Sequence, residues 1–590
     1  MAIENLITDH LELWTAAVRP KSSTGRGSNS KLELTGIKKL RELILELAVR
    51  GKLVPQDPSD EPAPVLLERI AAEKTRLVKE GKIKKPKALP EIGEDDKPFE
   101  LPDGWEWRRL PDICDYFSGK TPSTKNPIYW GGLDIDTPWV SISDMQHSGI
   151  VNLTSKKITT RAVDDVFKRS PTPAGTILMS FKLTVGKISY LGFDAYHNEA
   201  ILSIYPFNGI SKEFLFHFLP SIALRGNTKN AIMGNTLNAE SLSMLQIPIP
   251  PEDEQHRIVA KVDELMALCD QLEQRSEAQL AAHQTLVETL LATLTDSGDA
   301  EELAQNWARL STHFDTLFTT EASIDALKQT ILQLAVMGKL VPQDPSDEPA
   351  SVLLERIATE KARLVKEKKI KKEKPLPAIT EDEKPFELPQ GWAWCYLRDV
   401  ASFENGDRSS RYPNTNDLVN QGIPFFGAPD IVDGKLAYTP ELRYISQGKF
   451  NELSNGKLVD KDFVVLLRGS VGKVAQFLAS KNHQTGFINA QMLIIRFFEV
   501  GMIDYANVFF GSRIFKSIID EEKTGAVIQQ LPASKIAVMK MPLPPLSEQH
   551  RITAKLNQLI AICDQLKARL QTSQQTQLAL AESLVEGALA

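Results

Sequence analysis

The stretch GKLVPQDPSDEPA occupies Gly51–Ala63, and the same thirteen residues return unchanged at Gly338–Ala350. Each copy follows an amphipathic run, LRELILELAVR or LKQTILQLAVM, and its glycine stands where a helix would end in a left-handed cap. The prolines behind the glycine prevent another helix until VLLERIA begins. The acidic residues of the stretch lack the glycine-turned spacing of a calcium loop. We therefore predict a rigid connector between two helices, present twice.

The repeat continues on both sides of this connector. Ile37–Ile113 matches Ile324–Val400 without a gap, whereas the longer regions Gly104–Ile247 and Gly391–Met541 share little sequence. Because an internal repeat determines the architecture of a chain, it has to be identified first. We interpret the chain as two similar helical supports that carry two different variable regions.

A second repeated block follows each variable region. It reads PIPPEDEQHRI at Pro248–Ile258 and PLPPLSEQHRI at Pro542–Ile552, and its tandem prolines mark the start of a long helix. Apolar residues then recur in alternating steps of four and three, the spacing of a left-handed coiled coil. They are Ile258, Val262, Leu265, Cys269 and Leu272 in the first copy, and Ile552, Leu556, Leu559, Cys563, Leu566 and Leu570 in the second. We predict that the two seams pack on each other in antiparallel fashion; the alternative is a pair of amphipathic helices in separate cores.

The variable regions mix short strand-like runs with turns. Runs such as TPWVSISD, GTILMSF, AILSIYPF, DFVVLLRG and MLIIRFF predict strands, and helices are expected near Lys212–Leu224 and Met502–Ile518. The predicted class is α+β: two small α/β domains joined by long antiparallel coiled-coil helices in a pseudo-two-fold repeat. We expect an N-terminal helical region with the connector and a basic linker (1–103), a first variable domain (104–250), a central helical region with the second connector (251–390), a second variable domain (391–545) and a C-terminal coiled-coil helix (546–590).

Composition narrows the class of protein. At 590 residues the chain is too long for one core. No apolar run approaches the ~20 residues of a membrane helix, and the start MAIENLITDHLELW lacks a secretory leader. Four cysteines without a C-x-x-C pair argue against a disulfide framework and a thiolate zinc site, so we expect a cytosolic protein. A net charge of −7 disfavours a protein that coats DNA nonspecifically, but allows local DNA contacts.

Two divergent regions, each followed by P-x-P-P-x-x-E-Q-H-R-I and a long helix, resemble the specificity subunit of type I restriction–modification enzymes. PLPPLSEQHRI is the closer match to the family motif, and the resemblance covers nearly the whole chain. It implies that each variable region is a target recognition domain that reads one half of a split, asymmetric DNA sequence. The repeated helices would set the gap between the halves. The long segments before each variable region suggest the B family.

The resemblance also implies partners and cofactors. The partners would be double-stranded DNA, two modification (methyltransferase) subunits and ATP-driven restriction (motor and nuclease) subunits, in a bacterial or archaeal cytoplasm. S-adenosylmethionine, ATP and Mg would bind to those subunits and none of them to this chain. The sequence agrees, since it contains neither a phosphate-binding G-x-x-x-x-G-K-[ST] loop nor a G-x-G-x-x-G motif. Asn126-Pro-Ile-Tyr129 is similar to an adenine-methyltransferase motif but lacks its second proline, so we interpret it as a turn.

Two places in each variable region are candidates for DNA contact. A Gly-Lys pair follows a strand-like run in VGKIS (Val185–Ser189) and VGKVA (Val471–Ala475), as suits a phosphate-binding loop; a solvated hairpin is the alternative. GNTLN and GAVIQQL occupy matching later positions and carry amides, which can bind adenine edges. The candidates are Lys182, Lys187, Lys229, Asn235, Asn238, Arg468, Lys473, Lys523, Gln529 and Gln530.

Other features have simpler interpretations. The lysine runs at Lys79–Lys87 and Lys366–Lys374 are interpreted as solvated linkers, and the G-W-x-W pairs as anchors of each variable domain. The chain is thus predicted to be a noncatalytic DNA-reading subunit. A noncatalytic assembly scaffold with two divergent protein-binding domains is the alternative that the sequence leaves open.

Overall fold

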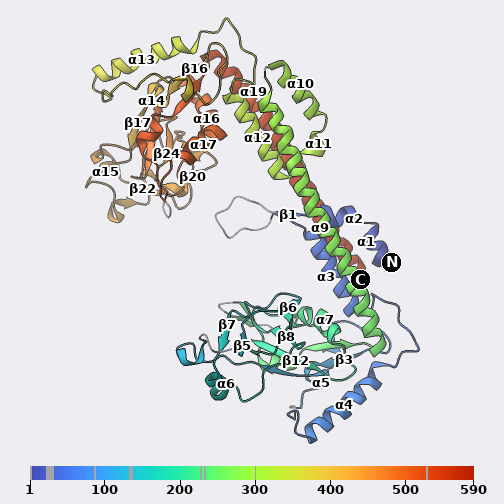
Figure 1. The fold of residues 1–590 in the computed structure, drawn as a ribbon. Helices are drawn as coiled ribbons and strands as arrows, with labels where there is room; N and C mark the ends of the chain where they lie inside the picture. The colour runs from blue at the N-terminus through green and yellow to red at the C-terminus, as the bar shows by residue number, and fades with distance from the viewer. Residues whose placement is uncertain are drawn as a thin grey trace. The chain divides into compact units, whose positions relative to one another are not determined.

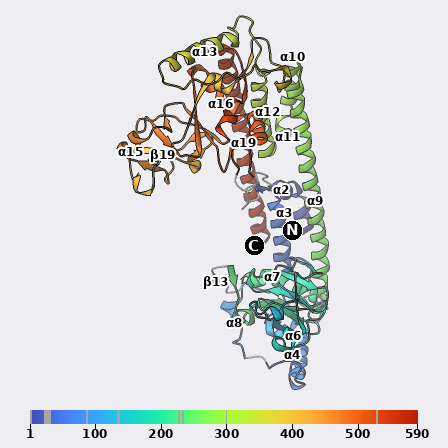
Figure 2. The ribbon, with the colours of Figure 1, turned by 60° about the vertical axis from the view of Figure 1, so that its left-hand side comes forward.

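The computed structural model describes residues 3–20, 32–85, 88–131, 137–225, 229–231, 234–298, 300–525 and 529–589 (Figures 1 and 2). The chain forms two compact units, Met1–Ala278 with Gln574–Ala590 (unit 1) and Gln279–Ser573 (unit 2). Each unit holds one variable region with its flanking helices, so the predicted α+β repeat is confirmed. None of the helices in the described ranges is both long and apolar enough to span a membrane.

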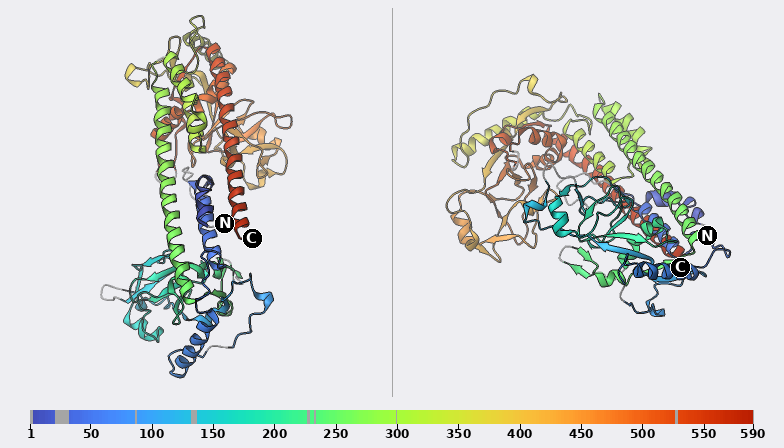
Figure 3. Two further views of the ribbon diagram at one scale, coloured as in Figure 1. Left: turned by 90° about the vertical axis from the view of Figure 1, so that its right-hand side faces the viewer. Right: turned by 60° about the horizontal axis from the view of Figure 1, so that its bottom comes forward.

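Two long helices, drawn in green and red in Figure 3, belong in part to both units. They are α9 (Glu252–Asp296) and α19 (Leu546–Leu589). Helix α9 begins in unit 1 and ends in unit 2, whereas α19 begins in unit 2 and ends in unit 1. Each unit therefore contains the start of one long helix and the end of the other.

In unit 1 the repeated short helix packs beside both long helices. The helices here are α1 (Ile3–Thr8), α2 (Leu11–Ala16), α3 (Thr35–Val49) and α4 (Ala63–Lys79), with the two-residue strands β1 (Arg19–Pro20) and β2 (Leu32–Glu33). Arg41 of α3 forms 2.6 Å ion pairs with Asp270 and Glu273 of α9. Lys39 of α3 lies 3.2 Å from Glu582 of α19.

Unit 2 repeats this arrangement. Its helices are α10 (Ala300–Ser311), α11 (Phe314–Leu317), α12 (Glu321–Val336) and α13 (Ala350–Lys366). Lys328 of α12 pairs with Asp564 of α19 at 2.5 Å, in the place of the Arg41–Asp270 pair. The core of this unit joins Val287 and Leu291 of α9 to α12 and to the first turns of α19.

The predicted seams are buried, but their partners differ from the prediction. Ile258, Val262, Leu265, Cys269, Ile552, Leu556, Leu559 and Cys563 are buried, and Leu272 and Leu566 are half-buried. The first seam lies in unit 1 and the second in unit 2. The α19 seam shares its core with α12 and with the last turns of α9. The two seams therefore do not pack on each other, but α9 and α19 do share a core in unit 2, where the α19 seam packs with a later part of α9.

The variable region of unit 1 contains two main sheets. One has the order β4 (Cys114–Ser118), β12 (Ile201–Pro206), β8 (Ile177–Ser180), β10 (Ile188–Leu191) and β6 (Gly149–Val151). The other has the order β11 (Tyr196–His197), β5 (Thr137–Val140) and β7 (Lys156–Ile158). Helix α7 (Lys212–Arg225) packs on β8 and β10, and the short helices are α5 (Leu110–Ile113), η2 (Pro127–Tyr129), α6 (Thr160–Val166) and α8 (Ala239–Ser243).

Unit 2 builds the same central sheet from unrelated sequence. The order is β17 (Ala401–Asn405), β27 (Met492–Phe497), β24 (Phe463–Leu466), β25 (Val474–Gln476), β21 (Lys435–Leu436) and β20 (Ile431–Val432). A second sheet has the order β18 (Leu418–Val419), β22 (Arg443–Ile445), β19 (Ile423–Phe426), β26 (Gly486–Ile488) and β23 (Lys457–Leu458). The short helices are α14 (Leu397–Val400), α15 (Gln447–Glu452) and α18 (Ala533–Ala537).

All five predicted strands are present in these sheets, as β5, β8, β12, β24 and β27. The helix expected near Lys212–Leu224 is α7. The helix expected near Met502–Ile518 is two helices, α16 (Ile503–Gly511) and α17 (Arg513–Glu522), because the Ser512 hydroxyl caps the second by accepting the Phe515 amide. At its boundary each variable region is closed by an antiparallel strand pair, β3 (Glu106–Arg109) with β15 (Gln246–Ile249) and β16 (Ala393–Tyr396) with β28 (Lys540–Leu543).

The duplicated connector joins the start of one long helix to the end of the other. In unit 1 the Asp60 carboxylate accepts two hydrogen bonds, of 3.1 and 2.6 Å, from the guanidinium of Arg257 near the start of α9. The Lys52 ammonium donates to the carbonyl of Leu589 at the end of α19 (3.1 Å). A cation is favoured at the carbonyl end of a helix.

Unit 2 repeats both contacts. Asp347 accepts bonds of 3.2 and 2.6 Å from Arg551 of α19. Lys339 donates to the Thr295 carbonyl near the end of α9 (2.8 Å). These contacts explain why the connector occurs twice unchanged, since it makes the same two attachments in each unit.

A tryptophan side chain at the start of each variable region also binds the start of a long helix. The indole N–H of Trp105 donates to Glu254 of α9 (2.9 Å), and that of Trp392 donates to Glu548 of α19 (3.0 Å). Burial raises the pKa of both glutamates. The predicted role of the G-W-x-W pairs as domain anchors is thereby confirmed, whereas their glutamate partners were not foreseen.

The connector glycines have the predicted left-handed conformation. Gly51 has φ +67° and Gly338 has φ +72°. A Cβ atom at Gly338 would lie 2.5 Å from Pro389 and 2.9 Å from the ring of Trp392, so the glycine is required by backbone and by packing.

We expect Asp347→Ala to lower the free energy of unfolding of unit 2 by about 1–3 kcal/mol, because Arg551 loses a charged hydrogen-bond partner. Arg551→Ala should also destabilise, and the double variant should lose less than the sum of the two. Urea unfolding of the full chain measures all three. Additive losses would show that the two side chains are not coupled.

Gly338→Ala should destabilise unit 2 by clearly more than Gly434→Ala. Both glycines have φ above +70°, but a Cβ atom at Gly434 meets nothing within 4 Å. The difference in melting temperature between the two variants therefore reports the contact with Pro389 and Trp392. Equal losses would mean that only the backbone conformation matters.

Candidate nucleic-acid interface

In unit 1 a small sheet brings distant candidate residues together. The hairpin between β8 and β10 turns at Gly186 (φ +82°) and contains the short strand β9 (Lys182–Leu183). Strand β14 (Gly234–Thr236) pairs with β9 on one side and with β13 (Lys229–Ala231) on the other. Thr236 lies opposite both Lys182 and Lys229, and Asn235 lies opposite Leu183. The backbones of Lys182, Lys229 and Asn235 thus belong to one small sheet.

Unit 2 has the corresponding hairpin between β24 and β25, which turns at Gly472 (φ +80°). Arg468 forms an antiparallel bridge with Gln530, and the Gly469 amide donates to the Gln529 carbonyl (3.0 Å). Arg468, Lys473, Gln529 and Gln530 are all exposed. The predicted residues of this region are therefore also brought together.

The two hairpins are the same structural element. The Leu237 amide donates to the Phe181 carbonyl at 2.9 Å, and the Leu531 amide donates to the Leu467 carbonyl at the same distance. We call Ser180–Lys187 in unit 1 and Leu466–Lys473 in unit 2 the hairpin loops. Each loop is paired with a later segment of its own domain, and the two loops carry different side chains at equivalent positions. Such a scaffold can present different chemistry in the same place.

The side chains of three candidate DNA-contact residues form a hydrogen bond or an ion pair within their own domain. The Lys187 ammonium donates to the Ile142 carbonyl (3.0 Å), and Lys523 pairs with Asp520 at 2.6 Å. The Asn238 side chain caps α8 by accepting the Ser241 amide (2.7 Å). The Lys182 ammonium lies 5.2 Å from the centroid of the Phe181 ring. Lys229 and Asn235 are placed by their backbone pairing alone.

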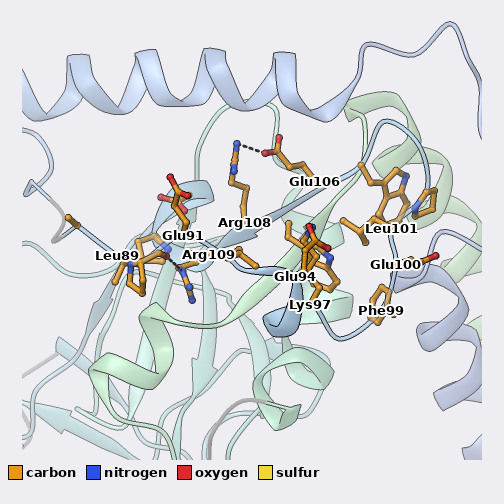
Figure 4. Close-up of a pocket in the computed structure, with 18 of the residues that line it drawn as sticks. Leu89, Glu91, Glu94, Lys97, Phe99, Glu100, Leu101, Glu106, Arg108 and Arg109 are labelled. Carbon is orange, nitrogen blue, oxygen red and sulfur yellow. Dashed lines mark hydrogen bonds and ion pairs between the residues drawn. The ribbon is translucent and has the colours of Figure 1, made fainter.

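The linker behind α4 lines an open pocket of about 1170 Å³ (Figure 4). Arg109 fixes this linker, since its Nε donates to the Pro90 carbonyl (3.1 Å) and its Nη1 to the Met244 carbonyl (3.3 Å). The lining mixes both signs of charge, and Arg108 pairs with Glu106 at 2.7 Å. This balance does not suit a polyanion, so we assign the cavity no role in DNA contact.

Apart from Lys84, which lines a cavity, the described lysines of both runs and the asparagine turn follow their simpler interpretations; Lys87 lies outside the described residues. Lys82 and Lys369 pair at 2.8 Å with the neighbouring Glu80 and Glu367, on exposed surface. The Asn126 side chain accepts the Ile128 amide (3.2 Å) and caps η2, as expected of a turn. Among the residues that the structure describes, no three His, Cys, Asp or Glu side chains are arranged to hold a metal ion.

One basic cluster was missed by sequence analysis. Lys84, Lys120, Lys168 and Arg169 line a cavity in unit 1. They come from three separate segments, so no local motif could have identified them.

Comparisons with known proteins agree with this architecture. Residues 102–282 and 389–573 match the family described as type I restriction modification DNA specificity domain. The chain is 42% identical to the specificity subunit of the type I restriction enzyme EcoAI of Escherichia coli, with 100% of both chains covered. It is 43% identical to the EcoEI specificity subunit of Escherichia coli, again over 100% of both.

A similarity to a solved structure was also found. The HsdS subunit from Thermoanaerobacter tengcongensis is 18% identical, with 83% of this chain and 98% of that chain covered and a TM-score of 0.40. The family match includes both variable domains and the start of each long helix, and the two full-length relatives leave no part of the chain uncovered. The chain therefore belongs to the specificity subunits of type I restriction–modification enzymes.

Proposed function

We propose that this chain reads a split, asymmetric DNA sequence, one half with each variable domain. The observation that carries the proposal is the pair of equivalent hairpin loops with different exposed side chains. Amides such as Gln529 and Gln530 can form bidentate hydrogen bonds with adenine, and arginine can do so with guanine. Lysines on the same loops suit the phosphate backbone. Because the two loops differ, the two half-sites should differ as well.

We propose that the long helices set the gap between the half-sites. Positions on one face of DNA recur every ~34–36 Å, and a helix of about forty residues spans ~60 Å. Each long helix is thus long enough to separate two DNA-binding domains by one or more turns of the duplex.

The proposed partners are double-stranded DNA, two modification subunits and the restriction subunits. Two nearly identical helical supports favour two copies of one partner. In this proposal adenine methylation and ATP-driven cleavage occur on those subunits, which would also bind S-adenosylmethionine, ATP and Mg, in a bacterial or archaeal cytoplasm. This chain would bind none of the three. No observation favours the alternative of a protein-assembly scaffold.

Selection from random duplexes, with the chain assembled on its modification subunits, tests DNA reading. We expect enrichment of a motif with two separated halves. Replacing Gly104–Ile247 by the corresponding region of another specificity subunit should change one half only. Flat retention of all sequences would support the scaffold, and a change in both halves would contradict independent reading.

Gln530→Ala is expected to relax the selection at one base pair of one half-site by about 1–3 kcal/mol, the range for one bidentate contact. Arg513→Ala, which changes an exposed side chain of α17 in the same unit, is the matched control. Affinities for duplexes with single base changes measure both variants. If Gln530→Ala weakened all sequences equally, the residue would not read a base.

Inserting seven residues into α9 after Ala278, and seven into α19 after Ser573, should lengthen each helix by about 10 Å while keeping its seam in phase. We expect a gap longer by about three base pairs with unchanged half-sites. The motif selected by the inserted chain checks this. Altered half-sites with an unchanged gap would count against the helices as spacers.

A further inference from the structure

The variable domain of unit 1 contains a cavity of about 680 Å³ with an unusual lining. Four of the lining residues are cations, from the linker behind α4, the end of β4 and the segment after α6: Lys84, Lys120, Lys168 and Arg169. None of the lining residues is an aspartate or glutamate. In a chain with a net charge of −7, this gathering of cations indicates an anionic ligand.

Aromatic rings form the remaining walls. The Arg169 guanidinium lies 3.8 Å from the centroid of the Phe117 ring, which is itself 5.8 Å from the Tyr205 ring. Phe167, which follows α6, and Tyr196 of β11 have ring centroids 4.3 Å apart. A planar ligand can stack on such rings, and arginine adds a cation–π contribution. The ligand that fits both features is a planar ring attached to a phosphate.

We propose that this cavity binds a nucleotide, with its phosphate on Lys168 and Arg169 and its base against Phe117 and Tyr205. The volume lies within the ~300–1,000 Å³ of small-ligand sites. Phe181 lines the cavity and directly precedes Lys182 of the hairpin loop, so the cavity adjoins the proposed DNA-reading element. The nucleotide comes either from free solution, the first source, or from the bound DNA, the second source. Only the second source depends on the proposed function.

Unit 2 provides an internal comparison. Strands β17 and β27 pair in the same register as β4 and β12, which places Glu404 and Arg496 at the positions of Phe117 and Tyr205. Arg496 lies 3.9 Å from Glu404 and 2.7 Å from Asp462, so ion pairs occupy this position. The residue corresponding to Lys120 is Asp407, which is buried and accepts the Ser409 amide (2.7 Å). The basic, aromatic lining is therefore a property of unit 1.

Calorimetric titration of the full chain with adenosine monophosphate tests the first source. We expect saturable binding that Lys168→Glu/Arg169→Glu weakens at least tenfold. Phe117→Ala should weaken adenosine monophosphate more than inorganic phosphate. The control is Lys125→Glu, which reverses an exposed charge of the same domain outside the cavity and should leave binding unchanged. Melting temperatures of all variants establish that they fold.

The second source is tested with the selected duplex and the complete complex. If the nucleotide belongs to DNA, the cavity variants lower duplex affinity at least tenfold, and Phe117→Ala affects base changes in one half-site only. The cavity proposal is overturned if neither titration responds to the cavity variants, or if Lys125→Glu has an equal effect. Normal sequence selection by those variants, together with unchanged binding of adenosine monophosphate, would reject the cavity and retain DNA reading. Binding of adenosine monophosphate without any sequence selection would retain the cavity and reject DNA reading.

Discussion

The attachment of the connector to both long helices is the constraint on which the rest of the structure depends. Asp60 and Asp347 bind an arginine at the start of one helix, and Lys52 and Lys339 bind carbonyl groups at the end of the other. A charged hydrogen-bonded pair of this kind is strong and directional. Because the tryptophan of each variable domain packs into the same junction, the domain is fixed to its helices through residues outside its own variable sequence.

Because each variable domain is fixed to the long helices through repeated residues, its own surface residues can diverge without loss of that attachment. The order β4-β12-β8-β10 corresponds to β17-β27-β24-β25, although the sequences share little. The central strands β8, β12, β24 and β27 are near-continuous apolar runs buried on both faces, a pattern that many different sequences can supply. The residues of the hairpin loops and of the neighbouring strands can therefore differ between the two domains. For example, Phe117 of β4 and Glu404 of β17 occupy equivalent positions. One framework thus presents two unlike surfaces, which is what an asymmetric target requires.

The sequence was sufficient to predict the features that local chemistry determines. The left-handed glycines, the five strands and the buried seam positions follow from backbone preference and periodicity. The partner of each seam could not be predicted, because apolar spacing identifies a buried face but not what covers it. The contact of Lys187 with Ile142 and the cation cluster around Arg169 depend on segments far apart in the chain.

The central claim is that two unlike domains of one chain contact one duplex at separate half-sites. Photo-crosslinking from Thr184 and from Ser470, equivalent exposed positions of the two hairpin loops, measures this directly in the complex with its partner subunits. The account predicts that each position crosslinks to a different half of the selected sequence, and that a doubly labelled chain crosslinks one duplex at both. Crosslinks from both positions to the same half, or a failure to join one duplex twice, would contradict it.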